Sequence, residues 1–367
     1  DIAIGETFSC ALTNDSAIRC WGENDKLGSS AGLSGSGAVG DGYREMGANI
    51  NVVDIGTWNG TSVEAGANHA CAVVNNGTND SLVCWGGNSA GQLGLGHTNT
   101  IGDDSGDLVG GELPHVDLPD RGSITNVALG NDHTCVLWSD GQIGCWGDNS
   151  QGQLGIGNTN TIGDGSNEMG SNLVLVDLPS SRSATAITAG NDFTCAILDD
   201  SSASCWGDGS NGRLGTGSTG DQGDESDEIG DDLNILNLGT GLGVASFDAG
   251  ESHVCAILTN GVLKCWGYNG FGQLGYGDGY DRGDDDNEMG NELESIQLGS
   301  GRFATSIQAG NAFTCALLDN AQVKCWGTGA DGRTGLELTG AMGEQVNEMG
   351  DNLAYVQLFM PLPTFSI

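Results

Sequence analysis

A loop rich in acidic residues recurs along the chain, and its side chains are of the type that binds divalent cations. Its clearest copy follows Gly163 and contains Asp164, Asn167 and Glu168. Carboxylate and amide oxygens are the ligands that Ca²⁺ prefers, and glycine lets a backbone bend around an ion. The candidate calcium ligands are Asp41, Glu45, Asp103, Asp107, Asp164, Asn167, Glu168, Asp224, Asp227, Glu228, Asp284, Asn287 and Glu288.

The same residue types also build turns, so the loop has a second interpretation. Asp, Asn and Gly are common turn residues, and an acidic side chain can accept hydrogen bonds from nearby backbone N–H groups. The spacing differs from that of the EF-hand loop, so the geometry of that motif is not expected. The sequence leaves both interpretations open: a structural loop or a calcium-binding one. We expect no other cofactor.

The cysteines form six pairs, and none is left over. On two antiparallel strands joined by a three-residue turn at residues 199–201, Cys195 lies opposite Cys205, at a separation that suits a disulfide. Six such pairs favour an oxidising compartment, whereas buried thiols in a cytosolic protein are the alternative. Zinc is disfavoured because no Cys-x-x-Cys spacing occurs. The predicted disulfides are Cys10–Cys20, Cys71–Cys84, Cys135–Cys145, Cys195–Cys205, Cys255–Cys265 and Cys315–Cys325.

These pairs belong to a repeat. The second cysteine of each pair opens the tripeptide Cys-Trp-Gly, at residues 20–22, 84–86, 145–147, 205–207, 265–267 and 325–327. A fixed period of about 60 residues indicates a repeat architecture. In one unit, short apolar or alternating stretches at residues 173–178, 184–189, 194–198 and 203–206 predict four short strands.

The repeated unit resembles the regulator of chromosome condensation repeat. The resemblance rests on Gly-Gln-Leu-Gly after Cys-Trp-Gly, as at residues 152–155, and on Ala-Gly-x-x-Phe/His-Thr-Cys before it, as at residues 189–195. It covers essentially the whole chain and implies an all-β propeller with four-stranded blades. We expect residues 1–367 to form one closed propeller of six blades, with residues 364–367 and the N-terminal strand sharing a blade. An open arc of a longer chain is the alternative.

The aromatic residues of the repeat are expected to pack rather than to react. His69, His133 and His253 occupy the position that Phe fills in the other units, which predicts a packing site. The Trp of each Cys-Trp-Gly is expected to lie in the core. Trp58 and Trp138 fall outside that register and are candidate contact residues.

Composition limits the possible functions. The chain has 49 Asp and Glu against 11 Lys and Arg, a formal charge of −38, which repels nucleic acid and anionic lipid. No apolar run is long enough for a membrane span. Four Asn-x-Ser/Thr sites occur, about the number expected by chance, so glycosylation is permitted but not indicated. They are Asn14, Asn59, Asn76 and Asn79.

No constellation of catalytic residues stands outside the repeat pattern, so we expect no enzyme. The sequence favours an extracellular or cell-surface scaffold that binds a protein partner or assembles with copies of itself as a homo-oligomer or filament. A secreted protein inhibitor and a lectin-like binder are the alternatives. A guanine nucleotide exchange factor, which the resemblance suggests, is less favoured, because the charge opposes chromatin and the paired cysteines oppose a nuclear location.

Overall fold

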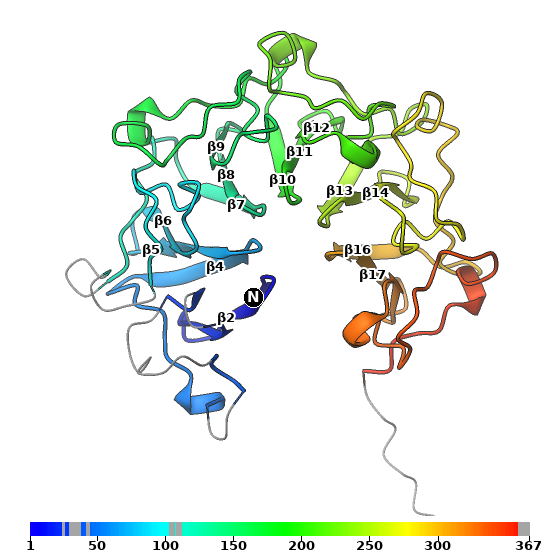
Figure 1. The fold of residues 1–367 in the computed structure, drawn as a ribbon, viewed down its shortest axis with the longest axis horizontal. Coiled ribbons are helices and arrows are strands. Elements are labelled where there is room, and N and C mark those ends of the chain that lie inside the picture. The colour runs from blue at the N-terminus through cyan, green and yellow to red at the C-terminus, as the bar shows by residue number, and fades with distance from the viewer. Residues whose placement is uncertain (24–25, 29–37, 42–44, 103–106, 108–111, 359–367) are drawn as a thin grey trace, which may run out of the picture. The chain divides into compact units, whose positions relative to one another are not determined.

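A computed structural model describes residues 1–23, 26–28, 38–41, 45–102, 107 and 112–358 (Figure 1). The chain divides into two compact units, which are described separately. The first contains Asp1–Asp208 and Gly220–Ile235, and the second contains Gly209–Thr219 and the residues from Leu236 onward. The prediction that residues 1–367 form one domain therefore stays a prediction.

The first unit holds four antiparallel sheets of three strands each. Short β-branched and apolar stretches form the strands, and Gly-, Asp- and Asn-rich turns end them. The sheets are β1 (Ile2–Ile4), β2 (Phe8–Leu12) and β3 (Ile18–Gly22); β4 (Asn59–Ala65), β5 (His69–Asn75) and β6 (Asp80–Gly86); β7 (Ile124–Leu129), β8 (His133–Trp138) and β9 (Ile143–Gly147); and β10 (Ala184–Ala189), β11 (Phe193–Leu198) and β12 (Ala203–Gly207). Short 3₁₀ helices in its loops are η2 (Gly47–Asn49), η3 (Gly170–Asn172) and η5 (Gly230–Asp232).

The second unit holds two sheets of the same kind. They are β13 (Val244–Ala249), β14 (His253–Leu258) and β15 (Leu263–Gly267), followed by β16 (Ala304–Ala309), β17 (Phe313–Leu318) and β18 (Val323–Gly327). Its 3₁₀ helices are η4 (Ser210–Gly212), η6 (Ala330–Gly332) and η7 (Gly350–Asn352). In the part of the chain that the structure describes, no helix has the length and apolar character needed to cross a bilayer.

The central hairpin of every sheet has the predicted register. Cys195 of β11 lies opposite Cys205 of β12, and the two form a disulfide with a Cα–Cα distance of 4.0 Å. All six predicted disulfides are confirmed, and no free cysteine remains. The longer spacing of Cys71 and Cys84 reflects a longer hairpin, in which the pairing continues out to Asn75 and Asp80.

The structure corrects the prediction of four strands in each unit. Residues 173–178 are predicted as a strand, yet Leu175 makes only an isolated bridge to Gly144 at the outer edge of its sheet. Next to that bridge, the N–H of Val176 donates to the carbonyl oxygen of Ile143 in β9, at 2.9 Å, while the carbonyl oxygen of Asp177 accepts from the N–H of Gly230 in a later loop. The pairing with β9 stops after this one bridge, which is too short for a strand. Among the described residues, each sheet therefore has three strands.

The shared terminal blade is not tested. β1 pairs with β2, from Ile2 opposite Ala11 to Ile4 opposite Ser9. Residues 364–367, which are predicted to add the other terminal strand, lie outside the described residues. Closure of the propeller therefore stays a prediction.

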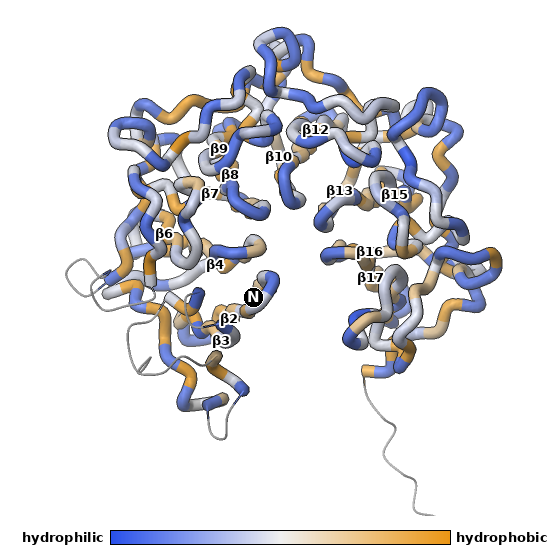
Figure 2. The backbone as a smooth tube through the Cα atoms, in the orientation of Figure 1, coloured by the Kyte–Doolittle hydropathy of each residue, from blue (hydrophilic) through white to orange (hydrophobic). Residues whose placement is uncertain are grey.

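The core of each unit lies between consecutive sheets. In Figure 2, hydrophilic and apolar residues alternate along the strands and along the connecting loops. Five of the six Cys-Trp-Gly tryptophans are fully buried, which confirms their expected place for those five: Trp85, Trp146, Trp206, Trp266 and Trp326. Trp21 is only partly buried.

The Cys-Trp-Gly glycine is required by close backbone approach. Gly147 has φ +105°, and a Cβ on it would lie 2.3 Å from the carbonyl oxygen of Asp132. A larger residue would clash with the neighbouring strand, so the tripeptide ends in glycine.

Candidate acidic loops and interaction surface

The glutamate of each acidic loop is engaged by the loop's own backbone. The Glu168 carboxylate accepts hydrogen bonds from the N–H groups of Gly163 and Gly165, both at 2.8 Å, through the same oxygen Oε2. Charge-assisted bonds of this kind close a turn more firmly than neutral ones. The structure therefore gives Glu168 a turn-closing role.

The other repeats build the same turn. The carboxylates of Glu228, Glu288 and Glu348 each accept two backbone N–H bonds, and those of Glu45 and Asp107 accept at least one. Burial and the adjacent Asp224 carboxyl raise the pKa of Glu228. Burial also raises the pKa of Glu288, and Asp284 adds to the effect. A carboxylate with a raised pKa is costly to keep charged, and the N–H donors offset part of that cost.

Of the remaining candidate calcium ligands, Asp224 lies beside Glu228 and Asp284 beside Glu288, but no larger group forms among the described residues. Asp41, Asp164, Asp227 and Asn287 are exposed, and Asp224 and Asp284 are partly buried. Asn167 and Asn287 have positive φ values of 69° and 72°, a conformation that asparagine tolerates in turns. Asp103 lies outside the described residues. Within the described ranges, no group of three or more His, Cys, Asp or Glu side chains is placed to hold a metal ion. Calcium binding stays a prediction.

The repeat histidines connect one sheet to the next. His133 Nε2 lies 2.9 Å from the hydroxyl of Thr194, and that hydroxyl donates to the carbonyl oxygen of Gln153 at 3.0 Å. The hydroxyl therefore accepts from Nε2, which leaves Nδ1 without a proton. Burial lowers the pKa of His133 to about 4. Trp206 Nε1 donates to the same Gln153 carbonyl at 3.1 Å, so the network ties two sheets and a loop together.

The same network appears twice more. His69 contacts Thr134 at 2.7 Å, and His253 contacts Thr314 at 2.9 Å. Burial lowers the pKa of His69 to about 3 and that of His253 to about 4. These fully buried, neutral rings are placed for packing and hydrogen bonding, as the alternation with phenylalanine predicts.

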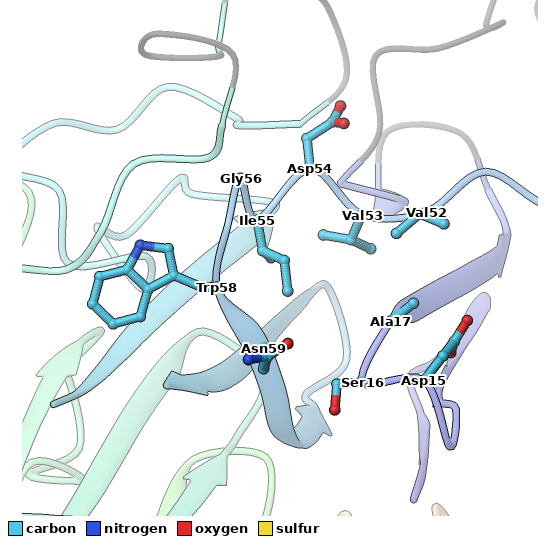
Figure 3. A pocket seen from close by; sticks show the side chains of 10 residues that line it. All are labelled: Asp15, Ser16, Ala17, Val52, Val53, Asp54, Ile55, Gly56, Trp58 and Asn59. Atoms are coloured by element: carbon cyan, nitrogen blue, oxygen red, sulfur yellow. The ribbon is translucent and has the colours of Figure 1, made fainter. Parts of the chain in front are cut away.

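The two tryptophans outside the register have different surroundings. Trp138 is 2% exposed, so its prediction as a contact residue is wrong; it packs over Gly144, where a larger side chain would collide with the indole. Trp58 is partly buried, and its ring lies 4.7 Å from that of His115. It lines an open pocket of about 350 Å³, but in Figure 3 its indole points away from Asp15 and Ala17 on the opposite side.

The four possible glycosylation sites lie in the first two sheets of the first unit. Asn14, Asn59, Asn76 and Asn79 are all exposed. Asn14 lies in the turn between β2 and β3, and Asn59 begins β4. Exposure is compatible with glycosylation, which stays a prediction.

Three exposed or partly exposed aromatic residues are missed by the sequence analysis. Tyr268 and Phe271 follow the fifth Cys-Trp-Gly, and Tyr280 follows the glycine-rich loop after it. Phe271 is 44% exposed and Tyr280 is 74% exposed. Comparison of the repeats with one another, rather than with a general motif, is the signal that finds them.

The six repeats match a known protein family. The family described as "Regulator of chromosome condensation (RCC1) repeat" matches this chain at residues 1–26, 61–92, 124–153, 184–213, 244–273 and 304–333. A second description of the same repeat matches residues 79–137 and 140–197. Five of the six sheets fall within a match, and the second does so except for Asn59 and Gly60. The chain belongs to the RCC1 repeat family.

Known RCC1-repeat relatives and folds agree with the architecture. The ultraviolet-B receptor UVR8 of Arabidopsis thaliana is 26% identical over 341 residues, which are 91% of this chain and 66% of that protein's length. The crystal structure of human WBSCR16 has a TM-score of 0.70 at 18% identity, covering 98% of this chain and 82% of that one. Prp20p of Saccharomyces cerevisiae has a TM-score of 0.70 at 19% identity, with coverages of 97% and 76%. At these sequence identities, the similarity to the two structures supports the fold and nothing further.

Proposed function

We propose that this RCC1-repeat chain is a non-enzymatic module that binds protein partners outside the cell or at its surface. One observation carries the proposal: each sheet is fixed internally by a disulfide, while exposed loops carry side chains that differ between repeats, such as Phe271 and Tyr280. A rigid framework with variable loops suits recognition of another macromolecule. Closure of the six sheets into a ring, which the described residues do not show, remains part of the proposal.

The relatives support protein binding in general terms. The structure of Prp20p is described together with its binding to Gsp1p and histones, and yeast RCC1 is known bound to Kap60. Those partners belong to those proteins. For this chain we take over only the use of the repeat as a protein-binding surface. Assembly with copies of itself is the second form of the proposal.

The proposed location rests on the cysteines. All twelve are paired across strands, and disulfides of this number persist in oxidising environments. A nuclear exchange factor would work among reduced thiols, so guanine nucleotide exchange stays the less favoured prediction. A secreted inhibitor would use the same kind of surface as the proposed module.

The test uses intact cells of the chain's own source and the proteins they secrete. Biotin-labelled chain is added, cross-linked and recovered, and the retained proteins are identified. We expect one or a few proteins whose retention is abolished by excess unlabelled chain and which bind the purified chain directly. Retention that unlabelled chain does not compete, or direct binding only of the chain's own copies in a dilution series, would reject a protein partner.

A further inference from the structure

The loops of the fifth repeat carry aromatic side chains where other repeats carry polar or small ones. Tyr268 is aligned with Gly, Asp or Thr in the second, third, fourth and sixth repeats, and Phe271 with Ala, Gln, Asn or Asp. Tyr280 is aligned with Asn or Gly. These repeats fold the same loop without the rings. The rings are therefore not required by the loop framework, and Tyr268, Phe271 and Tyr280 are called the aromatic patch below.

The structure holds the patch in two neighbouring loops of the second unit. The rings of Tyr268 and Phe271 meet edge to face, with centroids 6.2 Å apart. The side-chain amide of the buried Asn269 donates to the carbonyl oxygen of Asp278 at 2.9 Å. The backbone N–H of Asn269 donates to Asp281 Oδ1 at 2.7 Å. These bonds fasten the loop of Tyr280 against the loop of Phe271. The backbone of the two loops that carry the rings is thus ordered before any partner binds, which lowers the entropic cost of binding.

Exposed aromatic rings on a prearranged loop are typical of interaction surfaces. Tyr and Phe are enriched in the buried centres of protein interfaces, because a rigid ring supplies large contact area at little conformational cost. Phe271 and Tyr280 are the most exposed members, at 44% and 74%.

The charges around the patch select the partner. Asp278 and Asp281 lie in the Tyr280 loop, and the backbone of Glu344 lies against Gly272, next to Phe271: a Cβ on Gly272 would be 2.3 Å from the Glu344 nitrogen. One local cation, Arg282, is already paired with Asp278 at 2.8 Å. The chain as a whole carries a charge of −38. A basic partner is therefore attracted both over long range and at the patch.

The same unit already places its own cations on tyrosine rings. The guanidinium carbon of Arg282 lies 5.2 Å from the centroid of Tyr276, and Lys324 Nζ lies 4.7 Å from that of Tyr355. A cation is attracted to the face of an aromatic ring, and nearby carboxylates attract the same cation. We propose that the aromatic patch is a docking site for an Arg- or Lys-containing segment of a protein partner. This inference rests on the proposed function and names the partner's chemistry.

A second copy of the chain is a poorer occupant. With 49 acidic residues against 11 basic ones, two copies repel each other, and most basic side chains described here are already paired or buried. A basic segment from another protein meets neither obstacle.

The test measures binding of a fluorescent Arg-Gly repeat peptide by anisotropy, in about 150 mM salt to screen the remote charge. The variant Phe271→Ser/Tyr280→Ser removes two rings and leaves the charge unchanged. The matched control is Phe303→Ser, which removes an aromatic residue that is 52% exposed and outside the patch. We expect at least about a fivefold loss of affinity in the double variant and less than about a twofold loss in the control. Equal affinities of the double variant and the unchanged chain would overturn the proposal.

A gain-of-binding variant keeps the result independent of damage to the fold. Gln151→Phe/Asn158→Asp/Asn160→Tyr/Thr161→Asp copies the two exposed rings and the two carboxylates into the third repeat, where we expect a second peptide site. Binding of an oligosaccharide series that depends on the patch, with no patch-dependent peptide binding, would overturn the proposal in favour of a lectin. Self-association that the double variant abolishes would overturn it in favour of a second copy. A protein partner that binds the double variant and the unchanged chain equally would refute the patch and leave the proposed function standing.

Discussion

At the scale of single residues, the chain uses its chemically versatile side chains for construction. The cysteines are paired in disulfides, and Trp206 and His133 both reach the Gln153 carbonyl, one directly and one through Thr194. The pattern is internally consistent: a sheet with His is followed by a sheet with Thr at the contacting position, whereas Phe8 is followed by Ala70. A histidine here marks a hydrogen bond between sheets and not a catalytic base.

The buried histidines predict loss of stability in acid. Because burial lowers the pKa of His133 to about 4, the unfolded chain, whose histidines titrate near 6.5, binds protons first as the pH falls. Stability is fully present above about pH 6.5 and is lost as the pH falls toward 4, by up to about 3 kcal/mol for one such residue. In the neutral ring, Nδ1 has no hydrogen-bond partner among the described residues. Thermal unfolding between pH 7 and 4 measures this loss.

The control variant copies the chain's own apolar pair. His133→Phe/Thr194→Val places the residues that occupy these positions elsewhere in the repeat, as in Phe193 and Val254. We expect near-unchanged stability at pH 7 and a shallower decline toward pH 4. A decline as steep as that of the unchanged chain would show that other groups govern the acid response.

At the scale of elements, a buried lysine holds the fifth and sixth sheets to the loop before and the loop after each of them. In the fifth sheet, Lys264 Nζ donates to the carbonyl oxygens of Leu238 and Gly290, at 2.9 and 2.7 Å. Lys324 makes the equivalent bonds in the sixth sheet, to Leu298 and Gly350. Burial lowers the pKa of both lysines, as expected for ammonium groups removed from water.

Removal of this lysine should loosen the loop. Lys264→Met keeps the length of the side chain but leaves two carbonyl oxygens without their donor, so we expect a loss of about 1–3 kcal/mol in the free energy of unfolding. Arg302→Met is the control, because the Arg302–Asp319 pair is partly exposed and should contribute less than about 1 kcal/mol. Urea unfolding of both variants provides the comparison. Equal effects would contradict the proposed anchoring role of Lys264.

The calcium prediction also belongs to the loops. If the acidic loops hold Ca²⁺, millimolar Ca²⁺ should raise the melting temperature above that in chelator, because binding to the folded state alone stabilises it. Mg²⁺ at the same concentration is the control, since it prefers a smaller octahedral site. Identical melting curves in Ca²⁺ and chelator would leave Glu168 and its counterparts only their turn-closing role.

The sequence alone predicts the features that recur in every repeat with a regular spacing. The register of Cys195 and Cys205 follows from a three-residue turn, and the repeat period follows from Cys-Trp-Gly. The missing fourth strand could not be predicted, because the apolar pattern of residues 173–178 does not reveal that their pairing with β9 stops after one bridge. The prediction that Trp138 is a contact residue is wrong because the sequence does not distinguish a buried indole from an exposed one. Its indole is buried because Gly144 leaves space for it.

At the scale of the whole molecule, the chain is built of RCC1 repeats that are each closed by a disulfide. Every described sheet has one cross-strand disulfide, so the redox state of the environment acts on all six sheets at once. Each bridge closes a short loop and is expected to add somewhat less than about 3 kcal/mol to the stability of its hairpin. The strong negative charge then favours basic partners over nucleic acid and anionic lipid.

The most direct measurement is a thiol count on the chain isolated from its own source and alkylated at once under denaturing conditions without reductant. We expect the intact mass of the chain to show no alkylated cysteine before reduction and twelve after reduction. Twelve alkylated cysteines before reduction would place the chain in a reducing compartment and contradict the proposed extracellular role.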